Sequence, residues 1–239
     1  EEGQSLLYFP EGTRSRDGNL GNFKRGMTKF ILKTYFENKN SQNIDDILFV
    51  PIGLAYSRVP EDVRFSKNKK SNAEKINLIK DFFDFRKDKI VNYMHIGKSI
   101  SLNDFFNDNL DLQGHLGKAV KDLSKYLKQE LSKTIPILQQ DIYYSAIAHC
   151  LESSKTDTIY LKNLRKRVNE ICVRLYDSYS PKLLKAKEGM GDFLLRLHER
   201  ELLFNGQITI KIKNKKIMEY YSNKLSSFYE NHKLDNEDK

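Results

Sequence analysis

One loop near the start of the chain gathers residue types that suit an anionic ligand. It reads Phe9-Pro10-Glu11-Gly12-Thr13-Arg14-Ser15-Arg16-Asp17-Gly18. Gly12 lets the backbone approach a ligand closely, and the hydroxyls of Thr13 and Ser15 can donate hydrogen bonds. The guanidinium groups of Arg14 and Arg16 match phosphate oxygens two at a time. The loop therefore predicts a phosphate-binding segment, with a solvated basic turn as the simpler interpretation.

The elements around this loop predict a layered α/β core. Ser5 to Phe9 is a short apolar run bounded by Gly3 and Pro10, which is typical of a buried strand. Apolar residues recur at helical spacing from Gly26 to Phe36, and Ile47 to Leu54 predicts a second buried strand. The order strand, loop, helix, strand favours a βαβ arrangement.

Further elements complete the predicted fold class, which is α/β with a mixed sheet flanked by helices. The first part, residues 1–133, also holds a helix at Ala73–Phe85, a strand at Lys89–Ile96, a capped helix opening at Ser101-Leu102-Asn103-Asp104 and an amphipathic helix at Gly114–Lys133. The second part, residues 134–239, is mainly helical. Its predicted helices are Ile142–Leu151, Tyr160–Leu175, Leu183–Phe204 and Ile217–Tyr229, with an edge strand at Gln207–Ile212.

The overall charge favours an anionic partner. The chain carries 41 Lys and Arg against 32 Asp and Glu, a net charge of +9. Phosphorylated substrates, acidic lipid headgroups and nucleic acid all fit this sign. Nucleic acid is disfavoured, because the sequence has no helix-turn-helix, zinc-finger or RNP-type pattern. The basic stretches Arg165–Arg167 and Lys211–Lys216 predict either a solvated face or contact with a membrane surface.

Two other classes of feature are weak in this sequence. Cys150 and Cys172 are too few for a disulfide framework or a metal cluster, so buried thiols are expected. The longest nearly apolar run, Ile47 to Tyr56, is too short to cross a bilayer and contains Pro51, so no transmembrane helix is expected.

The phosphate loop closely resembles the third conserved block of the glycerophospholipid acyltransferase superfamily, Phe-Pro-Glu-Gly-Thr-Arg-Ser. Val50-Pro51-Ile52-Gly53 resembles the fourth block, at a spacing that fits. Two weaker likenesses follow: Ile96–Leu102 resembles a glycine-containing strand end, and Glu219–Lys224 resembles a Tyr-Tyr-x-Asn element of bacterial glycerol-3-phosphate acyltransferases. Together they favour the glycerol-3-phosphate and dihydroxyacetone-phosphate branch over the compact lysophosphatidate branch.

The resemblance implies transfer of an acyl group from acyl-CoA or acyl-carrier protein to glycerol 3-phosphate, at the cytoplasmic face of a membrane and without a cofactor or metal. Acceptors of the related enzymes, lysophosphatidate or dihydroxyacetone phosphate, are the alternatives. The predicted substrate-binding residues are Glu11, Gly12, Thr13, Arg14, Ser15, Arg16 and Pro51. Arg14 is the expected phosphate contact. Glu11 would orient Arg14 or a substrate hydroxyl, and Pro51 would touch substrate or shape the pocket.

The family's catalytic block, His-x-x-x-x-Asp, is absent from this sequence. In that block, histidine is the general base and aspartate holds its tautomer. Five positions after His95, His115, His149, His198 and His232 stand Ile100, Val120, Ser154, Leu203 and Glu237. We therefore name no catalytic residue, and we expect this chain to be an inactive C-terminal portion of a longer acyltransferase. A non-catalytic remnant that binds an anion or a membrane surface is the alternative of another class.

Overall fold

The computed structural model of the chain describes residues 5–13, 15, 17–39, 45–59, 90–112, 114–154, 156–178, 184–185 and 189–233. They fall into two compact units. The first unit comprises residues 1–15, 20–53 and 96–134, and the second comprises residues 16–19, 54–95 and 135–239. The predicted helix at Ala73–Phe85 lies outside the described residues.

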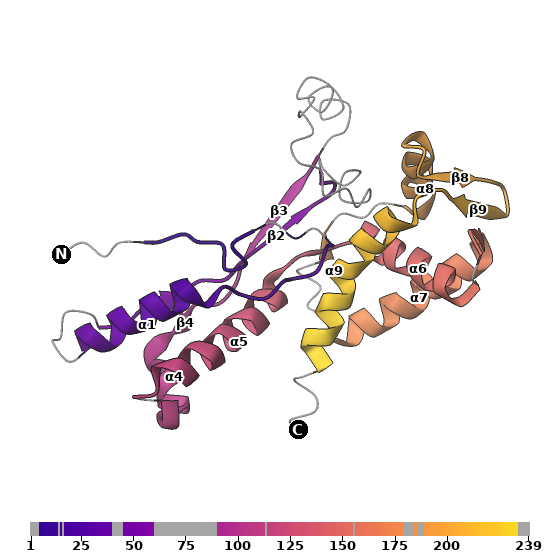
Figure 1. Cartoon of the computed structure of the whole chain (residues 1–239). Coiled ribbons are helices and arrows are strands. Elements are labelled where there is room, and N and C mark those ends of the chain that lie inside the picture. The colour runs from indigo at the N-terminus through magenta and orange to yellow at the C-terminus, as the bar shows by residue number, and fades with distance from the viewer. Residues whose placement is uncertain are drawn as a thin grey trace, which may run out of the picture. The chain divides into compact units, whose positions relative to one another are not determined.

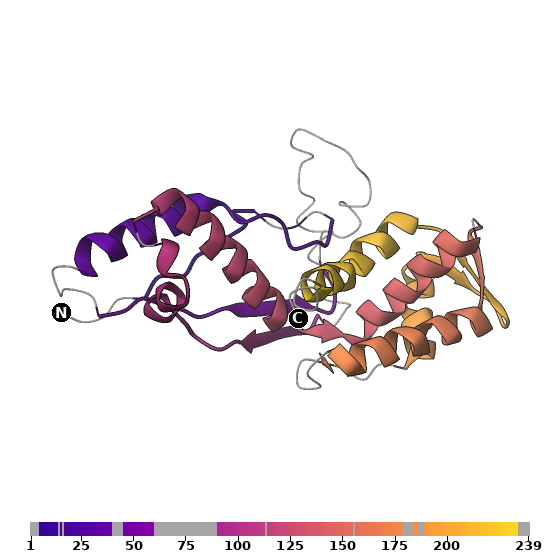
Figure 2. The same ribbon diagram turned by 90° about the horizontal axis from the view of Figure 1, so that it is seen from below.

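The first unit is built on two long helices that pack side by side, α1 (Arg25–Lys39) and α5 (Leu116–Thr134) (Figure 1; Figure 2). α5 confirms the predicted amphipathic helix, because its apolar residues recur every three or four positions and face the core. The short helices α4 (Leu102–Asp108) and η1 (Leu110–Leu112) close this core. Its buried members include Leu32, Tyr35, Phe106, Leu112 and Leu123.

The predicted start of α4 is confirmed. Ser101 precedes the helix with an extended backbone, and its Oγ accepts a hydrogen bond from the Asp104 N–H at 3.1 Å. This satisfies one of the free N–H groups in the first turn. Ser101 Oγ also donates to Asp46 Oδ2 at 2.5 Å, which ties the helix start to the chain before β1 (Leu48–Phe49).

The second predicted strand, Ile47 to Leu54, is two strands. β1 ends at Phe49 and β2 (Ile52–Tyr56) begins after Pro51. Proline has no N–H to give to a strand ladder, so the two segments pair separately. β1 runs antiparallel to β4 (Ile100–Ser101), and β2 pairs with β3 (Asn92–Ile96), the strand predicted at Lys89–Ile96.

The prediction of a buried strand at Ser5–Phe9 is wrong. This segment has no strand structure, and the exposed fractions of Leu6, Leu7 and Phe9 are 65%, 75% and 72%. A strand is held by hydrogen bonds to a neighbour, and no described strand pairs with these residues. More generally, the described strands form small separate sheets of two or three strands and not one layered mixed sheet. The α/β character is confirmed, while the layering stays a prediction.

The second unit centres on α6 (Gln139–Ser154), which packs against α7 (Leu161–Ser178) and α9 (Lys215–Lys233) (Figure 1). Residues 140–148 of α6 are all buried, as expected for a helix that is covered on every side. The rings of Tyr144 and Tyr221 stack with centroids 4.5 Å apart, and Phe193 from α8 (Met190–Glu199) meets Tyr144 edge to face. β5 (Ile137–Leu138) pairs in parallel with β7 (Leu184–Lys185).

Two predictions in this unit are corrected. The stretch predicted as one helix from Leu183 to Phe204 holds β7, α8 and β8 (Leu203–Asn205), because α8 ends at Glu199 and Glu201 turns the chain with a φ of 56°. The predicted edge strand, β9 (Thr209–Ile212), is central. It pairs antiparallel with β8 on one side and with β6 (Thr158–Tyr160) on the other.

Candidate functional site

The first part of the predicted phosphate loop is a closed turn. The Gly12 N–H donates to the Phe9 carbonyl at 3.0 Å, so Pro10 and Glu11 occupy the corner of the turn. Proline at the second position and glycine at the fourth are favoured in such turns. Gly12 has a φ of 69°, in the left-handed region that favours glycine. The Lys24 N–H donates to the Pro10 carbonyl at 2.7 Å, which brings the returning chain onto the turn.

The Glu11 side chain forms a hydrogen bond with the backbone of the loop region. Its Oε2 accepts a hydrogen bond from the Gly21 N–H at 2.8 Å. A Cβ at position 21 would lie 2.7 Å from the same oxygen, so a side chain there would require the Glu11 carboxylate to shift. A hydrogen bond to a carboxylate is stronger than one between neutral groups. Glu11 therefore acts on the backbone of its own loop, a role that was not among those predicted for it.

The structure describes the two hydroxyl residues of the loop but not its two arginines. Thr13 is exposed and Ser15 is half-buried in the first unit. Arg14 and Arg16 lie outside the described residues. The contacts predicted for the two arginines with a phosphate therefore stay predictions.

Pro51 contacts Gly97. The Pro51 carbonyl accepts the Gly97 N–H at 2.8 Å. A Cβ on Gly97 would lie 2.4 Å from Thr134 Cγ2 and 3.0 Å from Pro51 Cγ, so the glycine is required for this packing. Both predicted roles of Pro51, shaping the pocket and touching substrate, stay predictions.

The end of the loop contacts two residues that were not predicted as site residues, Asn223 and Tyr220. In the second unit, the side-chain amide of Asn223 donates to the Asp17 carbonyl at 2.8 Å. Gly18 has a φ of 87°, and a Cβ there would lie 1.9 Å from the Tyr220 carbonyl oxygen. The Asp17 carboxylate accepts from the Asn19 N–H at 3.0 Å. The Tyr-Tyr-x-Asn likeness was the one sequence signal that pointed to these α9 residues.

A buried ion pair in the second unit was also missed. Asp141 is 2% exposed, and its Oδ2 accepts the Leu138 N–H at 3.0 Å, as a third-position carboxylate does in a capping box. Its Oδ1 lies 3.6 Å from Lys224 Nζ, and neither atom has a hydrogen-bond partner among the residues that the structure describes. Burial raises the pKa of Asp141, while the nearby Lys224 charge opposes the shift.

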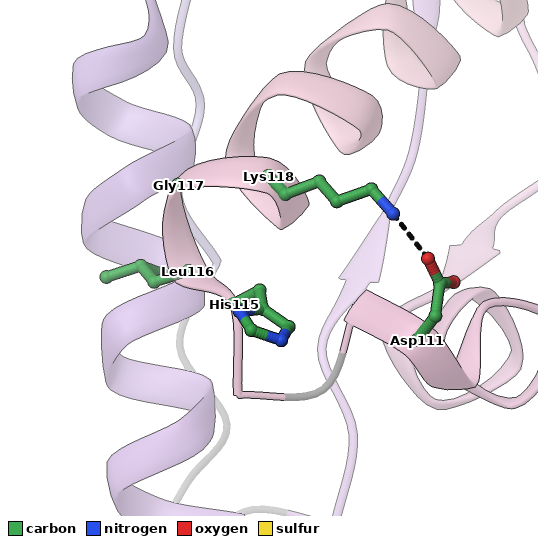
Figure 3. Close-up of a pocket in the computed structure, with 5 residues that line it drawn as sticks. All are labelled: Asp111, His115, Leu116, Gly117 and Lys118. Carbon is green, nitrogen blue, oxygen red and sulfur yellow. Dashed lines mark hydrogen bonds and ion pairs between the residues drawn. The ribbon is translucent and has the colours of Figure 1, made fainter.

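A shallow pocket lies at the start of α5, lined by Asp111, His115, Leu116, Gly117 and Lys118 (Figure 3). Lys118 forms an exposed ion pair with Asp111, while Leu116 points the other way, toward α1 (Figure 3). The side-chain hydrogen bond from Lys118 is the largest cause that lowers the pKa of Asp111. We assign this pocket no catalytic role, because its one carboxylate is engaged by a lysine and does not orient His115.

In the described part of the chain, His149, His198 and the two cysteines show no catalytic pairing. His149 lies 3.8 Å from Glu152 on an exposed helix surface, and His198 Nδ1 lies 3.3 Å from the Leu203 carbonyl oxygen. Burial raises the pKa of both Cys150 and Cys172, which disfavours the reactive thiolate. Across the described part of the chain, no cluster of three His, Cys, Asp or Glu residues could hold a metal ion. No helix among the described residues has the length and apolar character to cross a membrane.

Comparison with known proteins finds a family match in the first quarter of the chain. Residues 1–55 match the family model described as Acyltransferase. A glycerol-3-phosphate acyltransferase of Alteromonas mediterranea is 24% identical over 188 residues, which is 71% of this chain and 22% of that protein. A second enzyme of that name, from Pseudoalteromonas atlantica, is 25% identical over 247 aligned residues, covering 94% of this chain and 29% of the relative.

A shorter match is closer in identity. A chloroplastic 1-acyl-sn-glycerol-3-phosphate acyltransferase of Arabidopsis thaliana is 53% identical over 34 residues, which is 14% of this chain and 10% of that protein. The chain thus spans less than a third of the length of each of these relatives. The family match contains both the Phe9–Gly18 loop and Pro51. Residues 1–55 are therefore similar to the acyltransferase family.

Proposed function

We propose that this chain forms the acceptor-binding part of an enzyme that transfers a fatty acyl group from acyl-CoA or acyl-carrier protein to glycerol 3-phosphate. The observation that carries the proposal is the closed Phe9–Gly12 turn, held by Glu11 and Gly21, within the segment that matches the acyltransferase family. A turn that is already formed lowers the ordering cost of the loop when a ligand binds. Arg14 and Arg16 follow this turn in the sequence.

The reaction sets out what such a segment must do. The acceptor hydroxyl oxygen attacks the thioester carbonyl carbon, and the carbon–sulfur bond breaks. The hydroxyl proton passes to a general base, and the thiolate takes up a proton as it leaves. This chain would supply binding and orientation of the phosphate end, which brings the hydroxyl to the thioester. We assign the base to none of its residues, because no histidine here has aspartate five positions on.

Glycerol 3-phosphate is preferred as the acceptor for one reason. The two relatives that align with 71% and 94% of this chain both carry the name glycerol-3-phosphate acyltransferase. The 1-acyl-sn-glycerol-3-phosphate acyltransferase match covers 34 residues and keeps lysophosphatidate as a second candidate. Dihydroxyacetone phosphate is a third acceptor of the same chemical class.

The site of action proposed for the enzyme is the cytoplasmic surface of a membrane. The net charge of +9 and the exposed basic residues Lys162, Arg165 and Lys166 on α7 support contact with acidic headgroups. Binding of the chain to anionic vesicles, lost at high salt, would support this proposal. If the chain binds such vesicles but the full-length protein acylates no glycerol phosphate, the non-catalytic remnant is the correct interpretation.

Arg14→Ala tests the phosphate assignment. We expect the KM for glycerol 3-phosphate of the full-length protein to rise about 10- to 150-fold, because a charge-assisted hydrogen bond contributes about 1.5–3 kcal/mol. The matched control is Lys33→Ala, which removes a cation from the exposed Lys33–Glu37 pair on α1. An unchanged KM in Arg14→Ala would contradict the assignment, as would an equal rise in the control.

A further inference from the structure

α9 contacts two stretches of the second unit that lie far from it in the sequence. Tyr220 and Asn223, one turn apart, meet Asp17 and Gly18 at the end of the phosphate loop. Tyr221, on the neighbouring face, accepts the Val59 N–H on its hydroxyl at 3.0 Å. These contacts join α9 to segments that lie more than 160 residues earlier in the chain.

The α9 side of these contacts is closely packed. The Tyr221 ring is fully buried and stacks on Tyr144 of α6 at 4.5 Å, and Tyr220 is 8% exposed. A helix segment with such packing keeps its neighbours at fixed positions. Asn223 lies between the buried residues Ser222 and Leu225, so its backbone is part of this packed segment.

The end of the phosphate loop contacts α9 through Asp17 and Gly18. The Asp17 carbonyl oxygen receives the Asn223 amide N–H at 2.8 Å, while the Asp17 carboxylate is used locally by Asn19 at 3.0 and 3.1 Å. Gly18 then passes so close to the Tyr220 carbonyl that a Cβ would lie 1.9 Å from its oxygen. α9 thus contacts the backbone at residues 17 and 18 through a hydrogen bond from Asn223 and a close approach of Tyr220.

We propose that Asn223 is a positioning residue for the phosphate loop. By holding the Asp17 carbonyl, it restricts the backbone beside Arg16, the second predicted phosphate contact. This inference rests on the proposed function, since it gives the loop a phosphate to bind. It also assigns a role to the Tyr-Tyr-x-Asn element: its first tyrosine and its asparagine receive the loop, and its second tyrosine fixes the helix in the core.

The decisive variant is Asn223→Asp, which keeps the shape of the side chain and replaces the donor with an acceptor facing a carbonyl oxygen. The matched control is Glu219→Ala, an exposed position one turn away on α9. Gly18→Ala perturbs the same contact from the loop side, through both its φ of 87° and the clash with Tyr220. Circular dichroism of each variant reports whether the helices are retained.

The first readout is amide hydrogen exchange of the peptide 15–22 in the 239-residue chain, which needs no ligand. We expect exchange to be about 2- to 12-fold faster in Asn223→Asp and Gly18→Ala, the range of one hydrogen bond, and unchanged in Glu219→Ala. Unchanged exchange in Asn223→Asp would overturn the anchoring.

The second readout is the KM and kcat of the full-length protein for glycerol 3-phosphate. A positioning residue for the phosphate should raise KM by about the same 2- to 12-fold, with kcat changed less than KM. Faster exchange with an unchanged KM would overturn the role in substrate binding. If the wild-type protein does not use glycerol 3-phosphate, the proposed function fails and this role fails with it, while the exchange result still decides whether Asn223 anchors the loop.

Discussion

Replacing Lys224 with methionine should cost the second unit far more stability than replacing Asp141 with asparagine. The Asp141 side chain is 2% exposed and that of Lys224 is 20% exposed, so the two charges differ in their access to water. Lys224→Met leaves a buried carboxylate that keeps the Leu138 hydrogen bond but has no ion-pair partner among the described residues. Loss of one partner from a buried pair costs about 3–5 kcal/mol near neutral pH.

Asp141→Asn has a smaller cost for a structural reason. The asparagine oxygen can still accept the Leu138 N–H, and the buried negative charge is gone. Lys224 Nζ keeps its position 5.0 Å from the Tyr221 ring centroid and part of its access to solvent. We expect a cost of about 1 kcal/mol or less. The double variant should then lie close to Asp141→Asn alone.

The pH dependence follows from the raised pKa of Asp141. A carboxyl whose folded-state pKa lies above the unfolded value stabilises the fold below about pH 4, and this contribution is lost as the pH rises through the folded-state pKa. Lys224 opposes the upward shift, so its removal raises the pKa further. The cost of Lys224→Met should therefore be smaller near pH 4 than near pH 7.

Urea unfolding of the chain, followed by circular dichroism at both pH values, measures these free energies. Lys216→Met, at an exposed position of α9, is the control for the loss of a lysine. Equal costs for the two single substitutions would refute this account of the pair. A cost of Lys224→Met that does not change with pH would refute the assignment of that cost to the Asp141 charge.

Two further substitutions test the supports of the first unit. Ser101→Ala removes the acceptor for the Asp104 N–H and the donor to Asp46, so urea unfolding should show a loss of about 1–2 kcal/mol, which Ser101→Thr should largely restore. A loss no larger than that of an exposed Ser→Ala change would contradict the cap. Glu11→Ala should speed amide exchange at Gly21 about 10-fold or more, since a hydrogen bond to a carboxylate contributes about 1.5–3 kcal/mol. Glu11→Gln, which keeps an acceptor, should fall between, and no change in Glu11→Ala would show that the contact does not hold the loop.

The strands show where prediction from sequence fails. β9 alternates Ile210 and Ile212 with polar residues, which predicts a strand with one buried face but says nothing about its two edges. Only the fold supplies β6 and β8 on either side. Ser5 to Phe9 has the composition of a buried strand, yet a strand forms only where a neighbour completes its hydrogen bonds, and the described residues provide none.

Local features were determined by the sequence itself, because neighbours along the chain encode them. The apolar stripe of α5 and the Ser101 cap each depend on residues within a few positions of one another. The tertiary structure alone decided the long-range partners. Asn223 reaches Asp17 across 206 positions and Lys224 reaches Asp141 across α6 and α9, and such contacts depend on how the core packs two remote segments.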